Sequence, residues 1–183
     1  SDKEILKGNF TFNSNYINVD EFMSQTATII DTINAETIEI KKFILKQIEA
    51  VNGINAGKKI EFLINVKDSD ALKVHSNFFS HIIQNLLTNA IKFSHPNSKV
   101  EINGQHLIDN YKLEIIDSGI GFNQTDSEKI FEKFTSLKRE GTQNEPTTGL
   151  GLFLTKMLVK KHKGEIFATS EGLNMGATFT III

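Results

Sequence analysis

The chain has 183 residues, of which 39% are apolar, and this is enough to form the core of one domain. It carries 20 basic and 22 acidic residues, a formal net charge of −2, without a basic cluster, so nucleic acid is not an expected partner. It has no cysteine, which excludes a disulfide framework and a cysteine-based zinc site and fits a reducing compartment.

The sequence has neither an apolar run of membrane-spanning length nor a recognisable signal peptide. We therefore expect a cytoplasmic domain, and leave open whether its parent protein is anchored in a membrane. Because the chain begins at Ser1 rather than Met, we expect it to be a piece of a longer protein. Residues 1–19 are interpreted as a linker with a short strand at Phe10–Phe12, and residues 20–183 as the main domain.

A long helical stretch is predicted over residues 20–51, with Asp20 as its N-cap. It forms either one helix or two helices with a break near Asn34, and Asn52–Gly53 is expected to end it. Its apolar residues recur at spacings of three, four or multiples of these: Ile30, Ile33, Ile44, Ile48 and Val51.

The rest of the chain mixes strands and helices without regular alternation, which predicts an α+β fold rather than a doubly wound one. Strands are predicted at 60–66, 100–102, 113–116, 165–170 and 177–183. Helices are predicted over 77–94, which stops before Pro96, and over 150–162. Residues 122–148 are polar and mixed, with a short apolar-spaced turn at Ile130, Phe131 and Phe134.

Two asparagines and a lysine share one face of the helix predicted over 77–94. At 100° per residue, Asn85, Asn89 and Lys92 fall in one narrow sector opposite a broad apolar face. A solvated face would favour Lys, Glu and Gln, because asparagine is a poor helix former. An amide oxygen can instead ligate a hard cation, and a lysine can contact a phosphate. Both interpretations stay open at this point.

A first glycine loop follows a predicted strand in the stretch IIDSGIGF. It places Asp117 directly after the strand, with Gly119 and Gly121 behind it. Asp-Ser-Gly is also good chemistry for an ordinary turn. The stretch is not a dinucleotide fingerprint, because the third glycine and the following helix are missing.

A second glycine loop, Thr147 to Leu152, immediately precedes a predicted helix. Glycines there let backbone N–H groups approach an anion, and the helix N-terminus favours negative charge; the alternative is a tightly packed helix start. The stretch from Gly53 to Lys59, GINAGKK, is not a Walker loop. Its spacing is one residue short, and the Ser or Thr after the lysine is missing.

These motifs, in their order along the chain, resemble the N, G1 and G2 boxes of the ATP-binding domain of sensor histidine kinases, a branch of the GHKL (HATPase) superfamily. The segment IFEKF at 130–134 resembles that family's F box, and residues 164–179 resemble its closing hairpin. The resemblance extends from about Ile60 to Ile183. Before Ile60 it is poorer, because the family's first helix is usually shorter than residues 20–51 would make it.

The resemblance implies a two-layer α+β sandwich of the Bergerat type: a mixed, mostly antiparallel sheet with helices on one face, and a lid at 122–148. It also implies ATP and Mg²⁺ as cofactors. Asp117 would accept a hydrogen bond from the adenine amino group, and Thr178 would support that contact through its hydroxyl or a water. Gly119 and Gly121 would let the backbone pass close to the base, and Phe93 would pack near it.

The resemblance assigns the remaining boxes to the metal and the phosphates. Asn89 would ligate Mg²⁺ through its amide oxygen, with Asn85 beside it. The phosphate contacts would come from Lys92, Lys133, Thr148, Gly149, Leu150 and Gly151. One position departs from the family pattern, and one histidine shares the sector of the asparagines. Thr147 stands where the family often has glycine, and His81 shares the sector of Asn85 but is interpreted as a solvated histidine.

The identity of Asn85 bears on the reaction. The superfamily also contains the hydrolases gyrase B, the mismatch-repair ATPases and the heat-shock chaperones, which resemble each other in having a glutamate at this position. An amide cannot take a proton from water, so efficient ATP hydrolysis is not expected. Phosphoryl transfer needs mainly positioning and charge neutralisation, which Mg²⁺, Lys92 and the second glycine loop could supply.

The phosphate acceptor is expected to lie outside this chain, so no catalytic residue is assigned within it. A histidine-kinase phosphoacceptor is typically followed by Glu or Asp. None of the five histidines is: His75, His81, His95, His106 and His162. The expected partners are a dimerisation domain of the same parent protein, which carries the acceptor histidine and would precede the linker at 1–19, and a response regulator. The chain alone is expected to bind Mg-ATP without phosphorylating itself.

Two alternatives to a sensor kinase stay open. An anti-sigma-factor type serine kinase resembles the same boxes, but the F box and the chain length favour a sensor kinase. A non-catalytic ATP-sensing module or scaffold is the other, and the intact nucleotide boxes argue against it.

Overall fold

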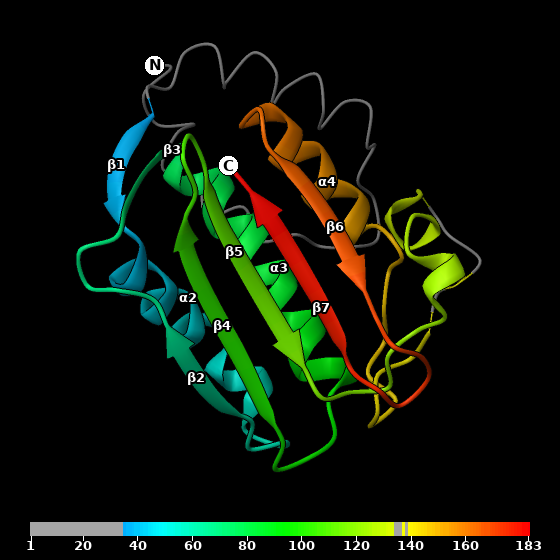
Figure 1. Ribbon diagram of the computed structural model, residues 1–183. Helices are drawn as coiled ribbons and strands as arrows, with labels where there is room; N and C mark the ends of the chain where they lie inside the picture. The colour runs from blue at the N-terminus through cyan, green and yellow to red at the C-terminus, as the bar shows by residue number, and fades with distance from the viewer. Residues whose placement is uncertain (1–34, 134–136, 138) are drawn as a thin grey trace, which may run out of the picture. The chain divides into compact units, whose positions relative to one another are not determined.

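A computed structural model of the chain describes residues 35–133, 137 and 139–183 (Figure 1). In chain order the elements are β1 (Glu36–Glu39), α2 (Ile40–Asn55), β2 (Glu61–Asn65), β3 (Ala71–Val74), α3 (Ser76–Phe93), β4 (Lys99–His106), β5 (Tyr111–Asp117), η2 (Gln124–Asp126), η3 (Lys129–Phe131), α4 (Gly151–Lys161), β6 (Glu165–Thr169) and β7 (Ala177–Ile182). Within these described ranges, no helix has the length and apolar character needed to cross a bilayer.

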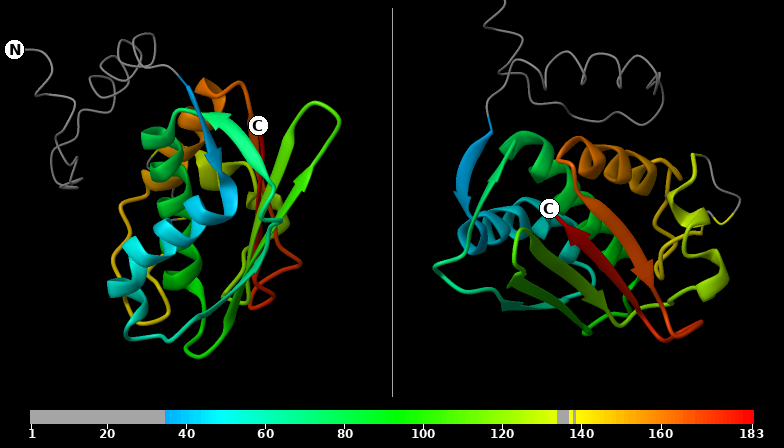
Figure 2. Two further views of the ribbon diagram at one scale, coloured as in Figure 1. Left: turned by 90° about the vertical axis from the view of Figure 1, so that its left-hand side faces the viewer. Right: turned by 45° about the horizontal axis from the view of Figure 1, so that its top comes forward.

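A five-stranded sheet forms one layer of the fold, with the strand order β2-β4-β5-β7-β6. β2 pairs with β4 in parallel, and the other neighbours are antiparallel. Helices α2, α3 and α4 form the second layer on one face of this sheet (Figures 1 and 2). The fold predicted from the sequence, a two-layer α+β sandwich with a mixed and mostly antiparallel sheet, is confirmed.

Helix α3 is the centre of the core. It packs against α2, α4 and β5. Its apolar face is buried: Phe78, Phe79, Ile82, Ile83, Leu86, Leu87, Ala90 and Ile91. Burying a large aliphatic side chain contributes about 1.5–3 kcal/mol, so this face fixes the rotation of α3 about its axis. The opposite face, which carries Asn85, Asn89 and Lys92, is therefore held in a defined direction.

The helical stretch predicted over 20–51 lies within the described residues only from residue 35 on, where residues 40–51 are helical as predicted and residues 36–39 are not. Residues 36–39 form β1, which pairs antiparallel with β3, so that Glu36 lies opposite Val74. Helix α2 begins only at Ile40, and it continues through Gly53 to Asn55. The pairing of β1 with a distant segment leaves no trace in local periodicity. Gly53 is tolerated in the helix, at a cost of about 1 kcal/mol relative to alanine.

Other differences concern the ends of elements. The strands predicted at 100–102 and 113–116 extend to Lys99–His106 and Tyr111–Asp117, and β3 was not predicted. The linker at 1–19, its strand at 10–12, the N-cap Asp20 and Phe134 of the F box lie outside the described residues.

Candidate functional site

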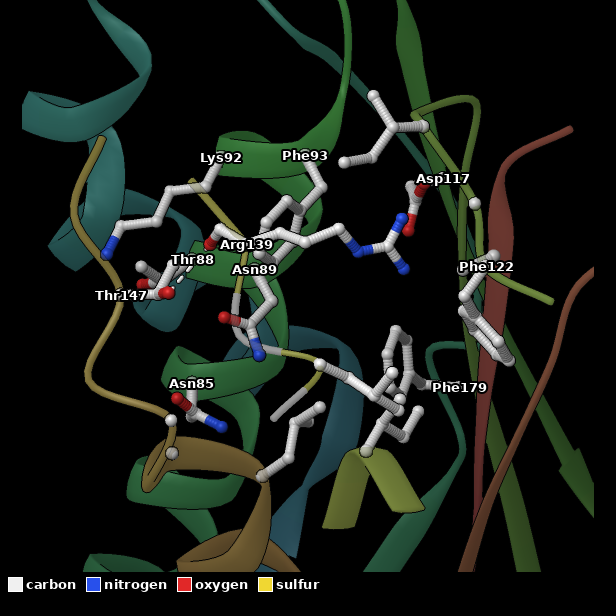
Figure 3. A pocket seen from close by; sticks show the side chains of 18 of the residues that line it. Asn85, Thr88, Asn89, Lys92, Phe93, Asp117, Phe122, Arg139, Thr147 and Phe179 are labelled. Carbon is white, nitrogen blue, oxygen red and sulfur yellow. Dashed lines mark hydrogen bonds between the residues drawn. The ribbon is translucent and has the colours of Figure 1, made fainter. Parts of the chain in front are cut away.

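A pocket lies between the polar face of α3, the end of β5, the start of β7 and the segment before α4 (Figure 3). The predicted site residues that line it are Asn85, Asn89, Lys92, Phe93, Asp117, Gly121, Thr148, Gly149 and Gly151. They come from three separate stretches of the chain. The fold thus brings the asparagine face and both glycine loops to one place.

Asp117 is the buried acid of this pocket. It is the last residue of β5, and it is only 6% exposed. Its Oδ1 accepts a hydrogen bond from the amide of Gly119 at 2.9 Å, and the amide of Ala177 also donates to the carboxyl. Burial raises the pKa of Asp117 to about 6, against the lowering effect of those two amides. The carboxyl is therefore mostly ionised at neutral pH and presents an acceptor to the pocket.

Gly119 lies beside the pocket rather than in its lining. It joins the loop after β5 to the end of α3, since it bridges to Ser94 and the next amide, of Ile120, donates to the carbonyl of Phe93 at 3.0 Å. A Cβ at position 119 would collide with that carbonyl and with Asp117 Oδ1. The close approach of these two backbone segments therefore requires glycine at position 119.

Asn85 is already engaged at its amide nitrogen. Its Nδ2 donates to the hydroxyl of Thr155 on α4 at 2.8 Å. The first residue of α4, Gly151, lies so close that a Cβ there would collide with Asn85 Oδ1. The amide nitrogen thus ties α3 to α4, and the amide oxygen is directed at the helix start.

Asn89 and Lys92 continue the polar face. Asn89 is half-buried, and its side chain points into the pocket (Figure 3). The Nζ of Lys92 donates to the carbonyl of Pro146 at 3.0 Å. Together with the N-terminus of α4, the Lys92 ammonium gives this end of the pocket a positive character that suits an anion.

Besides Gly119, three further predicted site residues are not among those lining the pocket. Lys133 is exposed, and Leu150 precedes α4, where its amide donates to the Thr148 hydroxyl at 3.3 Å. Thr178 pairs with Ile116 across β5 and β7, while its neighbours Ala177 and Phe179 line the pocket. Since side chains alternate along a strand, Thr178 faces away from the pocket.

His81 also differs from its interpretation as a solvated residue. It is half-buried and does not line the pocket. Burial lowers the pKa of its imidazole. His81 thus belongs to the packing of α3.

Sequence reasoning did not assign several lining residues: Thr88, Ile120, Phe122, Ile130, Leu137, Arg139, Thr147, Leu152, Ala177 and Phe179. Thr88 could have been found, because it lies three residues after Asn85 and four before Lys92 on the helix. The aromatic rings of Phe122 and Phe179 had no distinguishing pattern among the many phenylalanines of the chain. Arg139, whose guanidinium points across the pocket toward Asp117 (Figure 3), had no signal in spacing either.

The chain is similar in sequence to known proteins. Residues 74–183 match the family described as histidine kinase-, DNA gyrase B-, and HSP90-like ATPase. The sensor histidine kinase WalK of Bacillus subtilis is 29% identical over 154 residues, which make up 81% of this chain and 25% of that protein. The sensor protein kinase WalK of Staphylococcus aureus is 30% identical over 155 residues, 82% of this chain and 37% of that protein. The chain thus spans between 25% and 37% of the length of these relatives.

Solved structures share the fold. The mycobacterial sensor histidine kinase MprB superposes with a TM-score of 0.70 at 24% identity, covering 81% of this chain and 96% of that one. The catalytic domain of histidine kinase ThkA gives a TM-score of 0.71 at 20% identity, covering 82% and 95%. Full-length ShkA, solved in complex with AMPPNP, gives 0.68 at 21% identity, covering 81% and 30%. These neighbours support the architecture in which the pocket is built.

Proposed function

Since this chain belongs to the histidine kinase-, DNA gyrase B- and HSP90-like ATPase family, we propose that it is the catalytic ATP-binding domain of a sensor histidine kinase and binds Mg-ATP in the pocket of Figure 3. The proposal rests above all on Asp117, a buried and mostly ionised acceptor in a pocket with aromatic walls. The sequence relatives reported above are sensor histidine kinases, which favours this function over that of a serine kinase.

The Asp117 end of the pocket suits adenine. Phe93, Phe122 and Phe179 offer apolar surface to a flat ring. Asp117 would accept a hydrogen bond from the exocyclic amino group. Guanine carries a carbonyl oxygen at that position, so two acceptors would face each other in a desolvated site. The pocket would therefore select adenine over guanine.

The other end suits the triphosphate and its metal. Lys92 and the backbone N–H groups at the start of α4 would meet the phosphates, with Thr148 and Gly149 beside them. No group of three or more His, Asp or Glu able to hold a metal occurs in the described part of the chain. Mg²⁺ is commonly held by one or two protein oxygens together with substrate phosphates. The amide oxygens of Asn89 and Asn85 fit that role, and the metal would neutralise phosphate charge.

The side chain at position 85 favours transfer over hydrolysis. The amide of Asn85 has no basic lone pair to activate a water, and its nitrogen already donates to Thr155. The γ-phosphate would pass to a histidine on a dimerisation domain outside this chain, and from there to a response regulator. The chain's own groups would bind, orient and neutralise the nucleotide.

Calorimetry with Asp117→Asn tests the proposal. A hydrogen bond to a charged group contributes about 1.5–3 kcal/mol, so Mg-ATP affinity should fall by roughly 10- to 100-fold or more. Asp109→Asn, in the exposed turn between β4 and β5, is the matched control and should bind as the wild type does. Unchanged affinity in Asp117→Asn would remove that residue's assignment. A wild-type chain that binds no Mg-ATP would leave a non-catalytic module as the better explanation.

A further inference from the structure

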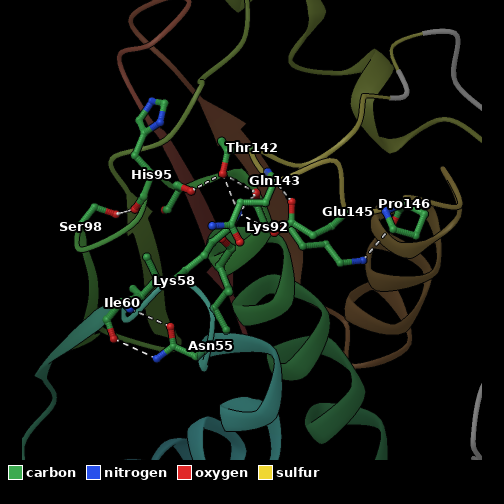
Figure 4. A network of polar contacts seen from close by, with 12 residues as sticks. Asn55, Lys58, Ile60, Lys92, His95, Ser98, Thr142, Gln143, Glu145 and Pro146 are labelled. Atoms are coloured by element: carbon green, nitrogen blue, oxygen red, sulfur yellow. Dashed lines mark hydrogen bonds and ion pairs between the residues drawn. The ribbon is translucent and has the colours of Figure 1, made fainter.

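A buried lysine outside the pocket contacts the segment that leads into it. Lys58 lies in the turn between α2 and β2, and its side chain is only 1% exposed. Asn55 braces this turn, since its side chain bonds both the amide and the carbonyl of Ile60 (Figure 4). Burying an ammonium group is unfavourable unless it is paired and hydrogen-bonded. The partners of Lys58 therefore indicate what it is for.

Two of these partners are carbonyls at the C-terminal end of α3. The Nζ of Lys58 donates to the carbonyl of Ile91 at 3.0 Å and also to that of Lys92. The last carbonyls of a helix lack intrahelical partners and form the negative end of its dipole, so a cation is favourable there. Lys58 thus fixes the backbone of Lys92, the residue proposed to contact phosphate.

The other two partners come from residues 141–146, here called the lid arm. Lys58 Nζ donates to the Thr142 hydroxyl at 2.7 Å and pairs with Glu145 Oε1 at 2.7 Å. The Thr142 hydroxyl donates in turn to the carbonyl of Ser94 at 2.7 Å, and the Thr142 amide to that of Lys92 at 2.9 Å. One ammonium group therefore joins the lid arm to the end of α3.

Glu145 also makes hydrogen bonds within the lid arm. Its Oε2 accepts from the amide of Gln143 at 2.7 Å, and its carbonyl accepts from the amide of Gly141 at 3.0 Å. Burial raises the pKa of the Glu145 carboxyl, but the hydrogen bonds from Lys58 and from backbone amides outweigh it, and the pKa lies below its ordinary value. The Glu145 carboxyl is thus ionised at neutral pH.

The lid arm leads directly into the phosphate end of the pocket. The carbonyl of Pro146, its last residue, accepts from Lys92 Nζ at 3.0 Å. Thr147, Thr148 and Gly149, which line the pocket, follow at once. Where the lid arm lies therefore decides where these three residues and the Lys92 ammonium lie.

We propose that Lys58 is a positioning residue for the triphosphate. Its hydrogen bonds and ion pair attach the lid arm to the end of α3. They would thereby orient Lys92 and residues 147–149 toward the phosphates. This role rests on the proposed ATP site. Lys58 is the first lysine of GINAGKK, a stretch that is not a Walker loop. It would thus position a phosphate site without contacting the phosphate.

Lys58→Met tests this role, because it removes the ammonium and keeps most of the side-chain length. Small displacements of positioning groups have large effects, so Mg-ATP affinity should fall by about tenfold or more. Affinity for adenosine, which has no phosphate, should stay within about twofold, as followed by NMR titration. The control is Lys59→Met, whose lysine is adjacent and exposed; it should bind both ligands as the wild type does. Equal losses for both ligands, or no loss for either, in a folded Lys58→Met chain would overturn the proposal.

Milder variants keep the test available if Lys58→Met does not fold. Glu145→Gln can still accept from Lys58 but loses the charge, and Thr142→Val removes one partner without changing volume. Each should lower the ratio of ATP to adenosine affinity in the same direction, and an unchanged ratio in both would contradict the positioning role. A wild-type chain that binds adenosine and Mg-ATP equally well would refute the phosphate site itself, and a wild type that binds neither would refute the proposed function.

Discussion

Asp117 combines two demands that oppose each other. As the acceptor that we propose for the base it must be ionised, yet its place in the pocket also removes the carboxyl from water. The amides of Gly119 and Ala177 reduce this conflict without removing it, since the pKa of Asp117 still rises to about 6. The residue therefore destabilises the nucleotide-free fold at neutral pH. Functional sites commonly carry such a cost.

This cost predicts a pH dependence of stability. The pKa of Asp117 is raised to about 6 in the folded chain from its ordinary 3.8, so the folded state binds the proton more tightly. The stabilisation from protonation is complete below about pH 3.8 and is lost as the pH rises to about 6, by roughly 3 kcal/mol in all. Asp117→Asn has no carboxyl at this position, so its stability does not fall in this way as the pH rises. The stability of the variant relative to wild type should therefore increase between pH 4 and 6.5 in denaturant unfolding, then level off. A difference that does not change with pH would contradict the pKa shift.

Among the elements of the fold, helix α3 has two faces of opposite character, one apolar and buried and one polar. The buried apolar face packs the helix into the core, and this stabilisation allows the other face to carry asparagines, which have low helix propensity. The start of α4 is packed onto that polar face through Gly151 and Asn85. The phosphate end of the pocket is thus an interface between two helices.

Gly151→Ala tests this interface. Alanine is the better helix former by up to about 1 kcal/mol, but its Cβ would collide with the Asn85 amide, which can rotate away. Stability should change by less than about 1 kcal/mol, while Mg-ATP affinity should fall about tenfold because the amide is displaced. Gly53→Ala in α2 is the control, since nothing lies within 4 Å of its new Cβ, and it should keep full affinity. Full affinity in Gly151→Ala would show that the position of Asn85 is not critical.

The sequence was a good guide to elements that are defined locally and a poor one to elements defined by distant partners. The polar face of α3 was predictable because helical periodicity alone places residues 85, 89 and 92 together. β1 was not, because its residues form a strand only by pairing with β3. The same limit explains Thr178, since the face a strand residue occupies depends on the register with β5.

At the scale of the whole molecule, the described domain holds the proposed nucleotide pocket, and the acceptor histidine is expected on another domain. All five histidines are within the described residues, and none lines the pocket. His75 and His162 lie at the N-terminal end of α3 and the C-terminal end of α4, with ring centroids 5.5 Å apart. Lys58 and the lid arm, by contrast, meet at the other end of α3.

The chain alone should therefore bind Mg-ATP without becoming labelled by it. After incubation with γ-labelled ATP, no stoichiometric acid-labile phosphate should remain on the protein. Adding the dimerisation domain with its acceptor histidine should give label on that domain only. Stoichiometric acid-labile label on the isolated chain would contradict the assignment of the acceptor to another domain.

The lid arm also changes the chain entropy of the fold. Residues 118–150 form the connection between β5 and α4, and closing a loop costs conformational entropy that grows with its length by about 0.6 kcal/mol per doubling. By attaching residues 141–146 to the end of α3, Lys58 divides this connection into a longer segment before Gly141 and a short one after Pro146. Insertions in the first segment that leave pocket-lining residues such as Phe122 and Arg139 in place would add a closure cost that varies slowly with length. Insertions after Pro146 would displace the pocket-lining residues 147–149 at the proposed phosphate site. The two segments should therefore tolerate changes of length very unequally.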